Sequence, residues 1–412
     1  MYVSIRDRPA GTRDGGAGRQ YRRVATTVVL LGVVSLLTDV SSEMVSAVLP
    51  LYLTAELGLG LIAFGFVDGI YQGVSAFVRI LGGLAGDRGR RPKWVAVIGY
   101  GVSAVSRVLM LAATGIATVT AVVTADRLGK GLRTAPRDAL IADASEPADL
   151  GRSFGVHRAL DTLGAAIGPI AAFALLAALP RAYDAVFVVS FAVALVGLAV
   201  LVLFVPDRRV GAGQARPPVR EVLRAATGPR LRRTLLAAGL LGVLTVGDGF
   251  LYLSLQHRDD FAALLFPLLY VGTNVAYLAL AVPLGRLADR VGRARTLVAG
   301  HGALLLAYLC AAGSSGGPLW TVLTLVLLGA FYAASDGVLA ALVSRLVPAP
   351  VTGTGIAAAQ TVVVLARFAS SVAFGALWVA AGRQPALLGF AVALAVAIPA
   401  AGWLLRGVEE ER

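Results

Sequence analysis

Apolar residues dominate long, regularly spaced stretches of this chain. Twelve stretches come close to or exceed the roughly 20 apolar residues that are needed to cross about 30 Å of hydrocarbon. None shows the alternation of polar and apolar residues that marks a β-barrel strand, so each predicts a transmembrane helix. The predicted spans are 24–53, 61–85, 94–114, 118–138, 153–179, 184–205, 234–256, 262–287, 296–313, 318–345, 353–381 and 386–405.

Basic residues fall almost entirely on one side of these predicted spans. If the N-terminus is cytoplasmic, 27 lysines and arginines lie in cytoplasmic segments, and the loops on the other side hold three, Arg181, Arg258 and Arg383. In membrane proteins the cytoplasmic loops carry the excess of Lys and Arg. The bias therefore predicts that both termini are cytoplasmic, and the same basic face is expected to meet anionic lipid.

The longest polar stretch between spans divides the chain near its middle. Residues 206–233 hold eight arginines and predict a cytoplasmic linker, in which Val219 to Ala226 are expected to form a short amphipathic helix on the membrane surface. The predicted organisation is a cytoplasmic N-terminal tail at 1–23, an N-terminal six-helix half at 24–205, the linker, a C-terminal six-helix half at 234–405 and a cytoplasmic C-terminal tail at 406–412.

The composition agrees with a membrane protein and excludes several other classes. Of the 412 residues, 57% are hydrophobic and 15% are charged, whereas ordinary globular domains have roughly 45–50% and about 25%. These values exclude a disordered chain, a disulfide scaffold and a cytosolic enzyme, and the single cysteine, Cys310, forms no internal disulfide. The net charge of +13 would suggest nucleic acid binding in a soluble protein, but here the positions of the bases explain it as a topology signal.

Two loops at the same place in each half have related sequences. They begin at Gly83 and Gly285, 202 residues apart, and a weaker similarity links 137–143 with 335–341. Internal repeats are typical of transporters whose halves rock about a site at their interface. In each loop a glycine is expected to let a helix end approach its neighbour, an aspartate to accept hydrogen bonds and arginines to pair with carboxylates, unless the loop is a basic turn that only sets topology. The residues in these roles are Gly83, Asp87, Arg88, Arg90, Arg91, Gly285, Asp289, Arg290 and Arg293.

These loops resemble the signature G-x-x-x-D-R-x-G-R-[RK] of the major facilitator superfamily, which follows the second and eighth helices of that family. The copy that begins at Gly285 matches through Arg293, while the copy that begins at Gly83 lacks one residue between Arg88 and Gly89. The resemblance covers the whole chain. It implies an all-α membrane protein with twelve transmembrane helices in two pseudo-symmetric six-helix halves.

Two further elements are similar to patterns of the same family. Residues 127–131 match R-x-x-[QK]-G, whose arginine the family associates with proton coupling. The span at 153–179 matches G-x8-G-x3-G-P, found mostly in proton-driven exporters, although Ala172 and Phe173 replace its trailing Gly-Gly; the alternative is plain helix packing. Residues 38–44 and 127–140 also resemble a bacterial permease branch related to drug/proton antiporters. The residues assigned to packing are Gly131, Gly155, Gly164, Gly168 and Pro169.

Fourteen charged residues remain inside the predicted spans. On insertion scales each central charge costs roughly 3 kcal/mol, so most must face the protein interior, paired or in cavity water. The bases are Arg79, Arg107, Arg127, Lys130, Arg133, Arg158 and Arg367, and the acids are Asp39, Glu43, Asp68, Asp126, Asp161, Asp248 and Asp336.

Depth in the membrane and helix face assign roles to part of this set. Asp39 and Glu43 lie one turn apart, and the i,i+4 spacing places His157 and Asp161 on one face, which suits a proton relay or a static hydrogen-bonded pair. In the family fold the third helix is peripheral, so Arg107 ranks below the residues of the first and fourth spans. The predicted proton-coupling residues are Asp39, Glu43, Asp68, Arg127, His157 and Asp161.

The remaining polar residues predict a cargo site. Lys130 and Arg133 lie lower on their span, where they are expected to pair with Asp161 or to receive an anionic group of the cargo. Asp248 stands between two glycines, which loosen a helix beside a buried carboxylate. We expect the N-terminal half to couple the ion and the C-terminal half to shape the cargo pocket. The predicted cargo residues are Lys130, Arg133, Arg158, Asp248, Asn274, Asp336 and Gln360.

Together these features predict a secondary active transporter. The sequence lacks clustered metal ligands, a G-x-x-x-x-G-K-[ST] phosphate loop and hydrolase motifs, so we expect no cofactor and no enzyme activity. The leading hypothesis is proton-coupled export of a small organic molecule by a monomer in the plasma membrane of a bacterium, in which protonation of an acid in the first or second span releases its pairing with Arg127. One alternative is a proton-coupled importer of an anionic metabolite, favoured if Lys130, Arg133 and Arg158 line the cavity. The other is a non-transporting membrane sensor on the same fold.

Overall fold

The computed structural model describes residues 24–74, 91–146, 149–207, 228–313, 316–335, 337–347 and 352–408, which are almost entirely helical and contain no strand. The N-terminal half contains α1 (Thr26–Leu51) with the π-helical turn η1 (Tyr52–Glu56), a helix over Leu61–Val74, α3 (Pro92–Leu109), α4 (Ile116–Asp143), α5 (Leu150–Ala178) and α6 (Tyr183–Phe204). The C-terminal half contains α8 (Pro229–Val243), α9 (Asp248–Asp259), α10 (Phe266–Val291), α11 (Arg293–Ala312), α12 (Pro318–Ser335), α13 (Val338–Leu346), α14 (Thr352–Ala381) and α15 (Arg383–Leu404).

In the part of the chain that the structure describes, each of the twelve predicted spans overlaps helical structure. Among the described residues, ten helices are long and apolar enough to cross a membrane, and the helix over Leu61–Val74 is a shorter apolar one. The 28-residue helix α4 is not among the ten, because charged side chains lower its hydropathy. Charges in a span are tolerated where they face protein or water, so α4 is the helix along which a polar site is expected.

The predicted span 234–256 is interrupted rather than continuous. Four non-helical residues separate α8 from α9, which begins at Asp248 between two glycines. The Tyr308 hydroxyl in α11 accepts a hydrogen bond from the N–H of Val246 at 2.7 Å and donates one to the carbonyl of Leu244 at 2.8 Å. Backbone groups inside a membrane need such partners because no water is available there. The prediction of one unbroken helix was therefore wrong, and a tyrosine from another helix satisfies the break.

Other helix boundaries also differ from the prediction. The predicted span 318–345 is divided into α12 and α13, and Gly337 precedes α13 with a φ of 77°, a conformation that favours glycine. The last residues of the predicted 206–233 linker belong to α8, which begins at Pro229, a residue suited to the first turn of a helix. Residues 208–227 of the linker, which include Val219 to Ala226, and residues 1–23 and 409–412 of the tails lie outside the described residues.

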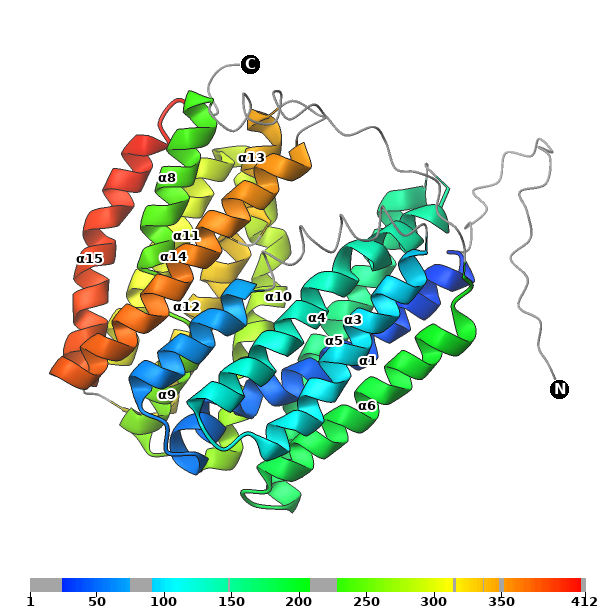
Figure 1. Cartoon of the computed structure of the whole chain (residues 1–412). Helices are drawn as coiled ribbons and strands as arrows, with labels where there is room; N and C mark the ends of the chain where they lie inside the picture. The colour runs from blue at the N-terminus through cyan, green and yellow to red at the C-terminus, as the bar shows by residue number, and fades with distance from the viewer. Residues whose placement is uncertain are drawn as a thin grey trace.

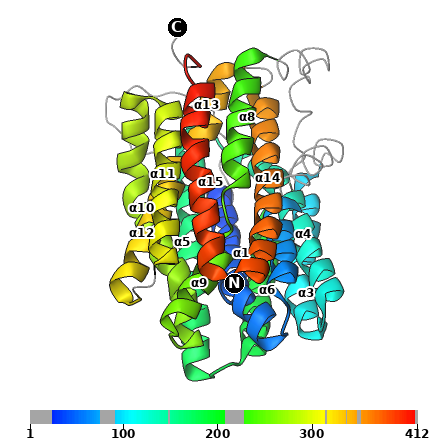
Figure 2. The same ribbon diagram turned by 90° about the vertical axis from the view of Figure 1, so that its left-hand side faces the viewer.

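The helices form two bundles that meet at one end and separate toward the other (Figure 1). We call the end at which α3 and α11 begin and α15 ends the arginine-rich end, because Arg91, Arg293 and Arg406 lie there. The opposite end, which holds η1 and the turns between α5 and α6 and between α14 and α15, is called the far end. Figure 2, viewed from the side of the C-terminal half, shows α14 and α15 running from one end to the other.

Aromatic rings and a glycine hold the two halves together at the far end. Phe250 of α9 lies edge to face with Phe64 of the N-terminal half, with ring centroids 4.7 Å apart, and with Phe374 of α14 at 5.1 Å. A Cβ at Gly375 of α14 would lie 2.6 Å from the carbonyl oxygen of Leu61, so the two backbones approach closely because glycine has no side chain. The far end is therefore closed by contacts between the halves.

The predicted packing glycines of α5 divide into two groups. Gly164 and Gly168 lie against α1, and a Cβ at Gly168 would lie 2.7 Å from the carbonyl oxygen of Val40. Pro169, next to Gly168, is buried as well. Gly155 is exposed, and nothing lies within 4 Å of a Cβ built there, so its predicted packing role was wrong because no neighbouring helix approaches it closely.

In α4 the close approach is made by a glycine that the sequence analysis did not assign. Gly131 is buried as predicted. The backbone contact between α3 and α4, however, involves Gly129, where a Cβ would lie 2.6 Å from the carbonyl oxygen of Gly99. The pattern therefore identified the right helix for close packing but not the residue at the contact.

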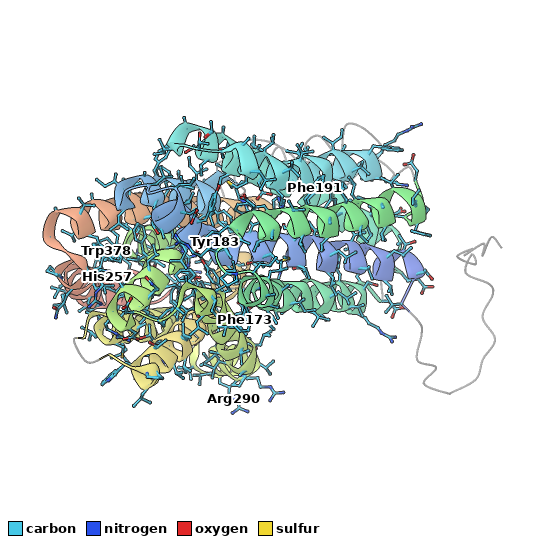
Figure 3. The ribbon with its side chains drawn as sticks, turned by 90° about the horizontal axis from the view of Figure 1, so that it is seen from below. Phe173, Tyr183, Phe191, His257, Arg290 and Trp378 are labelled. Atoms are coloured by element: carbon cyan, nitrogen blue, oxygen red, sulfur yellow. The ribbon has the colours of Figure 1, made fainter. Side chains whose placement is uncertain are left out.

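The C-terminal basic loop makes its contacts within its own half. Arg293 pairs with Asp289 at 2.9 Å and donates a hydrogen bond to the carbonyl of Ala341 in α13 at 3.4 Å. Arg290 projects outward at the edge of the bundle (Figure 3). No atom lies within 4 Å of a Cβ built at Gly285, so the predicted close approach there was wrong. In the N-terminal copy Arg91 is exposed at the start of α3, whereas Gly83, Asp87, Arg88 and Arg90 lie outside the described residues.

Candidate functional site

A cavity of about 220 Å³, which we call the central cavity, lies between the two halves. Its walls come from α1, the helix over Leu61–Val74, α4, α9 and α10. Tyr71, Gln72 and Tyr270 add polar groups that the sequence analysis missed, although each is a polar residue in an otherwise apolar span. Six residues predicted for coupling or cargo binding line the cavity together: Glu43, Asp68, Arg127, Lys130, Asp248 and Asn274.

Helical spacing explains why α1 and α4 present charged groups to the interior. Asp39 and Glu43 are four residues apart on α1, and Arg127 and Lys130 are three residues apart on α4. Residues three or four apart share one face of a helix with 3.6 residues per turn. Because each of these charges would cost roughly 3 kcal/mol against lipid, both faces turn inward.

Three buried charges, Arg107, Asp126 and Arg127, form a cluster that we call the charge triad. Asp126 accepts hydrogen bonds from Arg107 Nη1 through one oxygen and from Arg127 Nε, at 2.8 Å, through the other. The three residues are 4%, 8% and 4% exposed, in chain order. The triad therefore places one net positive charge in the membrane-spanning interior, where a nearby carboxylate can balance it.

Arg107 is more central than the sequence analysis ranked it. Its Nε and Nη2 atoms donate hydrogen bonds to the hydroxyls of Ser41, at 3.2 Å, and Ser42, at 2.8 Å, both on α1. Ser41 also bonds Ser190 of α6 at 2.9 Å. The position of Arg107 therefore joins α1, α3, α4 and α6, and the expectation that a residue of the third span is peripheral was wrong for this side chain.

Arg127 has a different partner from the one predicted. The structure pairs it with Asp126, its neighbour in α4, and not with an acid of the first or second span. Its guanidinium group lies over the ring of Tyr71, 3.7 Å from the ring centroid, and the Tyr71 hydroxyl is hydrogen-bonded to Ser46 of α1. Cation–π contacts of this kind stabilise a desolvated guanidinium. Arg127 is therefore fixed in place on the wall of the central cavity.

A second group of charges lies nearer the arginine-rich end. Arg133 Nη2 is 3.7 Å from Asp39 Oδ1, and Arg137 Nη1 is 3.8 Å from Asp161 Oδ1. The predicted pairing of Arg133 with Asp161 was wrong, because Arg137, one turn further along α4, lies beside Asp161 while Arg133 lies beside Asp39.

Lys130 lies between the charge triad and this second group. It lines the central cavity together with Glu43, and on α4 it lies one turn from both Arg127 and Arg133. The structure shows no ion pair between Lys130 and Asp161 among its described residues, so the other predicted partner was also wrong. A proton or a cationic group that neutralises Asp39 or Glu43 would therefore change the field at Lys130.

His157 and Arg158 do not take the positions predicted for them. His157 is 4% exposed, and neither ring nitrogen has a hydrogen-bond partner among the described residues, so it forms no hydrogen-bonded pair with Asp161. No described histidine belongs to a group of three potential metal ligands. The Arg158 side chain is 75% exposed, lies 4.0 Å from Asp161 and is not among the residues that line the central cavity.

A second space of about 310 Å³, which we call the C-terminal cavity, is lined mostly by residues of the C-terminal half. Gln360 lines it as predicted, together with His301 and Arg367, which the sequence analysis gave no role. The Arg367 guanidinium lies 5.9 Å and 5.8 Å from the rings of Phe331 and Tyr332. Gln72 lines both cavities and so connects them.

The predicted acids of the C-terminal half differ in how they are placed. Asp248 begins α9 and accepts a hydrogen bond from the Tyr332 hydroxyl of α12, so it is held at the wall of the central cavity. Asp336 lies outside the described residues. The position of Asp248 follows from the break between α8 and α9, because a helix start within the membrane brings its first side chain to the interface of the two halves.

Comparison of the sequence with known families and proteins identifies relatives that are membrane transporters. The family model of the Major Facilitator Superfamily matches residues 31–371. An uncharacterised MFS-type transporter of Methanocaldococcus jannaschii is 28% identical over 389 residues, which cover 90% of this chain and 94% of that protein.

Solved structures show the same arrangement of helices. A mutant of the nucleoside transporter NupG has a TM-score of 0.81 at 15% identity and covers 92% of this chain and 100% of its own. A POT family transporter in complex with 5-aminolevulinic acid has a TM-score of 0.76 at 12% identity, covering 93% of this chain and 97% of its own. At these identities the likeness establishes the fold, and the chemistry of the cavity must be argued from its own residues.

Proposed function

The chain belongs to the Major Facilitator Superfamily, and we propose that this secondary transporter is proton-coupled and exports a small organic molecule by alternating access. The observation that carries the proposal is the central cavity, where carboxylates from both halves share one space with the bases of α4. Ionisable groups inside a membrane are costly and mark ion or substrate pathways. The protein acts as a monomer in the plasma membrane of a bacterium.

In this proposal the arginine-rich end faces the cytoplasm. Arg290, Arg293 and Arg295 lie at that end, whereas the predicted outer loops with Arg181 and Arg383 lie at the far end. The positive-inside rule favours this orientation. The contacts at the far end then form the outer gate, and the conformation corresponds to a state that is closed to the outside.

Glu43 is the first proton carrier in the proposed mechanism. A deprotonated Glu43 balances the net positive charge of the triad and attracts Lys130. Two unit charges 4–8 Å apart interact by about 2–4 kcal/mol at an effective dielectric constant of about 20. Because Glu43, Arg127 and Lys130 line the same cavity, protonation of Glu43 removes attractions to these bases, and a change of a few kcal/mol is enough to shift two conformations that differ by that amount.

Asp68 is the second proton carrier, and its contacts link its protonation state to the outer gate. Its Oδ2 accepts a hydrogen bond from Ser371 of α14 at 2.7 Å, and the same carboxylate lies against Gly247, which precedes α9. Asp68 belongs to the N-terminal half, whereas both partners belong to the C-terminal half. A change in its protonation therefore alters a contact between the halves directly.

The charges of the two cavities favour a cationic or zwitterionic cargo. Three carboxylates and two bases line the central cavity, so a cationic group of the cargo is favoured there, and Arg367 in the connected C-terminal cavity suits an acidic group. Structural neighbours that carry nucleosides or bind 5-aminolevulinic acid support a small polar cargo. The alternative of an anionic metabolite importer is weakened because Arg133 pairs with Asp39 and Arg158 does not line the central cavity.

Reconstituted protein tests this proposal. Small cations, zwitterions and anions are screened for thermal stabilisation, and the stabilising compound is then followed in proteoliposomes with an entrapped pH dye under an imposed pH gradient. We expect gradient-driven exchange by the wild type and by Glu56→Gln, an exposed far-end control. We expect Glu43→Gln to lose the dependence on the gradient. Wild-type flux that ignores the gradient would overturn the coupling, and stabilisation by anions alone would overturn the cargo class.

A further inference from the structure

A recess of about 830 Å³ lies at the arginine-rich end of the C-terminal half, apart from the central cavity. It lies between the turn from α10 to α11, the first turns of α11 and the end of α15. We call it the arginine recess because five of its lining residues are arginines: Arg290, Arg293, Arg295, Arg345 and Arg406. None of these arginines lines either of the cavities already described.

The charge in the arginine recess is strongly unbalanced. Against five guanidinium groups, the lining contains one carboxylate among the described residues, Asp289, which pairs with Arg293 at 2.9 Å. Arg290, Arg295, Arg345 and Arg406 are exposed, and in Figure 3 Arg290 reaches out past the helices. Planar guanidinium groups bind phosphate through paired N–H donors. The recess is therefore built to attract a phosphate group.

An apolar slot continues from the recess along the bundle, between α11 and α15. Val298 and Gly302 of α11 and Ile398 and Gly402 of α15 belong to its lining. Nothing lies within 4 Å of a Cβ built at either glycine, so the slot is open where the two helices face each other. Gly302 lies seven residues beyond Arg295 in α11, which is about 10 Å along the helix axis at 1.5 Å per residue. The charged part of the recess and the apolar slot are therefore about 10 Å apart along α11.

We infer that the arginine recess binds an anionic phospholipid, with its phosphate among the arginines and one acyl chain in the slot. The charge alone would also suit inorganic phosphate, but phosphate makes no use of an apolar slot that opens beneath the arginines. Trp403, which is 68% exposed on α15, lies at the same level, as aromatic residues do at a membrane interface. Basic pockets between helices on the cytoplasmic side are suited to such headgroups.

The bound lipid would act on the turn that joins α10 to α11. Its phosphate competes with Asp289 for Arg293, which also holds the carbonyl of Ala341 in α13. The lipid would thus link α10, α11, α13 and α15 at the membrane surface. The recess belongs to one half alone, so the lipid would anchor that half while the other rocks. Binding itself does not depend on the proposed cargo or on proton coupling.

Native mass spectrometry of the full-length protein tests the site with phosphatidylglycerol and phosphatidylcholine of equal chain length. Each arginine near an anionic headgroup contributes about fivefold in affinity, so Arg290→Gln with Arg406→Gln should weaken phosphatidylglycerol retention by about 25-fold. The matched control is Arg232→Gln with Arg233→Gln, which should leave retention close to that of the wild type. Both arginines are exposed in the first turns of α8 at the same end but do not line the recess. Retention that falls equally in both double variants would contradict the site and leave only general surface attraction.

Blocking the slot separates lipid from free phosphate. Gly302→Leu with Gly402→Leu fills the slot without changing charge, and it should reduce phosphatidylglycerol retention at least tenfold while the thermal unfolding temperature stays close to that of the wild type. If retention is unchanged in this variant, or if millimolar inorganic phosphate displaces the lipid from the wild type, the acyl-chain part of the inference is wrong. Equal retention of phosphatidylcholine by the wild type would refute the requirement for an anionic headgroup.

Discussion

Replacement of Asp126 by asparagine tests the charge triad most severely. The substitution preserves the shape of the side chain and one oxygen, but it removes the negative charge that lies between Arg107 and Arg127. Both arginines are 4% exposed, so neither guanidinium can recover its hydration without rearrangement of the bundle. The N-terminal half would then hold an additional uncompensated charge where α1, α3 and α4 meet.

The burial of the charge triad determines how much the substitution should lower the free energy of unfolding. Removing one partner of a buried ion pair costs about 3–5 kcal/mol, whereas an exposed pair is worth less than about 1 kcal/mol. The control is Glu56→Gln, because Glu56 lies 3.6 Å from Arg181 and both side chains are largely exposed, at 42% and 77%. We therefore expect Asp126→Asn to lower the free energy of unfolding by about 3–5 kcal/mol and Glu56→Gln to lower it by less than about 1 kcal/mol.

Unfolding in mixed micelles, followed by circular dichroism as the fraction of sodium dodecyl sulfate rises, measures both free energies. A further substitution, Arg107→Gln in the Asp126→Asn background, removes one of the unbalanced charges and should restore at least about 1 kcal/mol through the coupling of neighbouring residues. The reasoning is refuted if Asp126→Asn unfolds within about 1 kcal/mol of the wild type. It is also refuted if the second substitution adds a further loss in place of a recovery.

Three other outcomes follow from particular contacts. Gly168→Ala should destabilise the protein because its Cβ would meet the α1 backbone at 2.7 Å, whereas Gly155→Ala should be neutral or stabilising by up to about 1 kcal/mol in the same titration. Tyr308→Phe removes two hydrogen bonds to the break between α8 and α9 and should cost about 1–3 kcal/mol; no loss would show that the break does not need the hydroxyl. Lys130→Gln should abolish cargo exchange in proteoliposomes while Arg158→Gln preserves it, and equal loss in both would contradict the assignment of the cavity wall.

The sequence was sufficient to predict where the apolar helices lie, although not every break within them. A run of about 20 apolar residues is a local signal that depends little on the rest of the chain. Charges within such a run must turn inward, which directed attention to Glu43, Lys130 and Asp248, and these residues line the central cavity. The interruption before Asp248 was less visible, because it depends on Tyr308 from a distant part of the sequence.

The pairing of the buried charges could not be predicted in the same way. Whether Asp161 meets Arg133 or Arg137 depends on the register of α4 against α5, which a single sequence does not encode locally. The central place of Arg107 likewise depends on the close approach of α3 to α4. Small residues allow that approach, but they do not specify which turn of one helix meets which turn of the other.

Proton release on cargo binding is the most direct test of the central claim that the cavity exchanges protons for cargo. Purified protein in a weakly buffered solution is mixed with the stabilising compound while a pH indicator records the protons that leave. The account predicts release by the wild type that falls sharply in Glu43→Gln and Asp68→Asn, since both carboxyl groups line the cavity. Cargo binding without proton release, or release that is unchanged in these two variants, would contradict it.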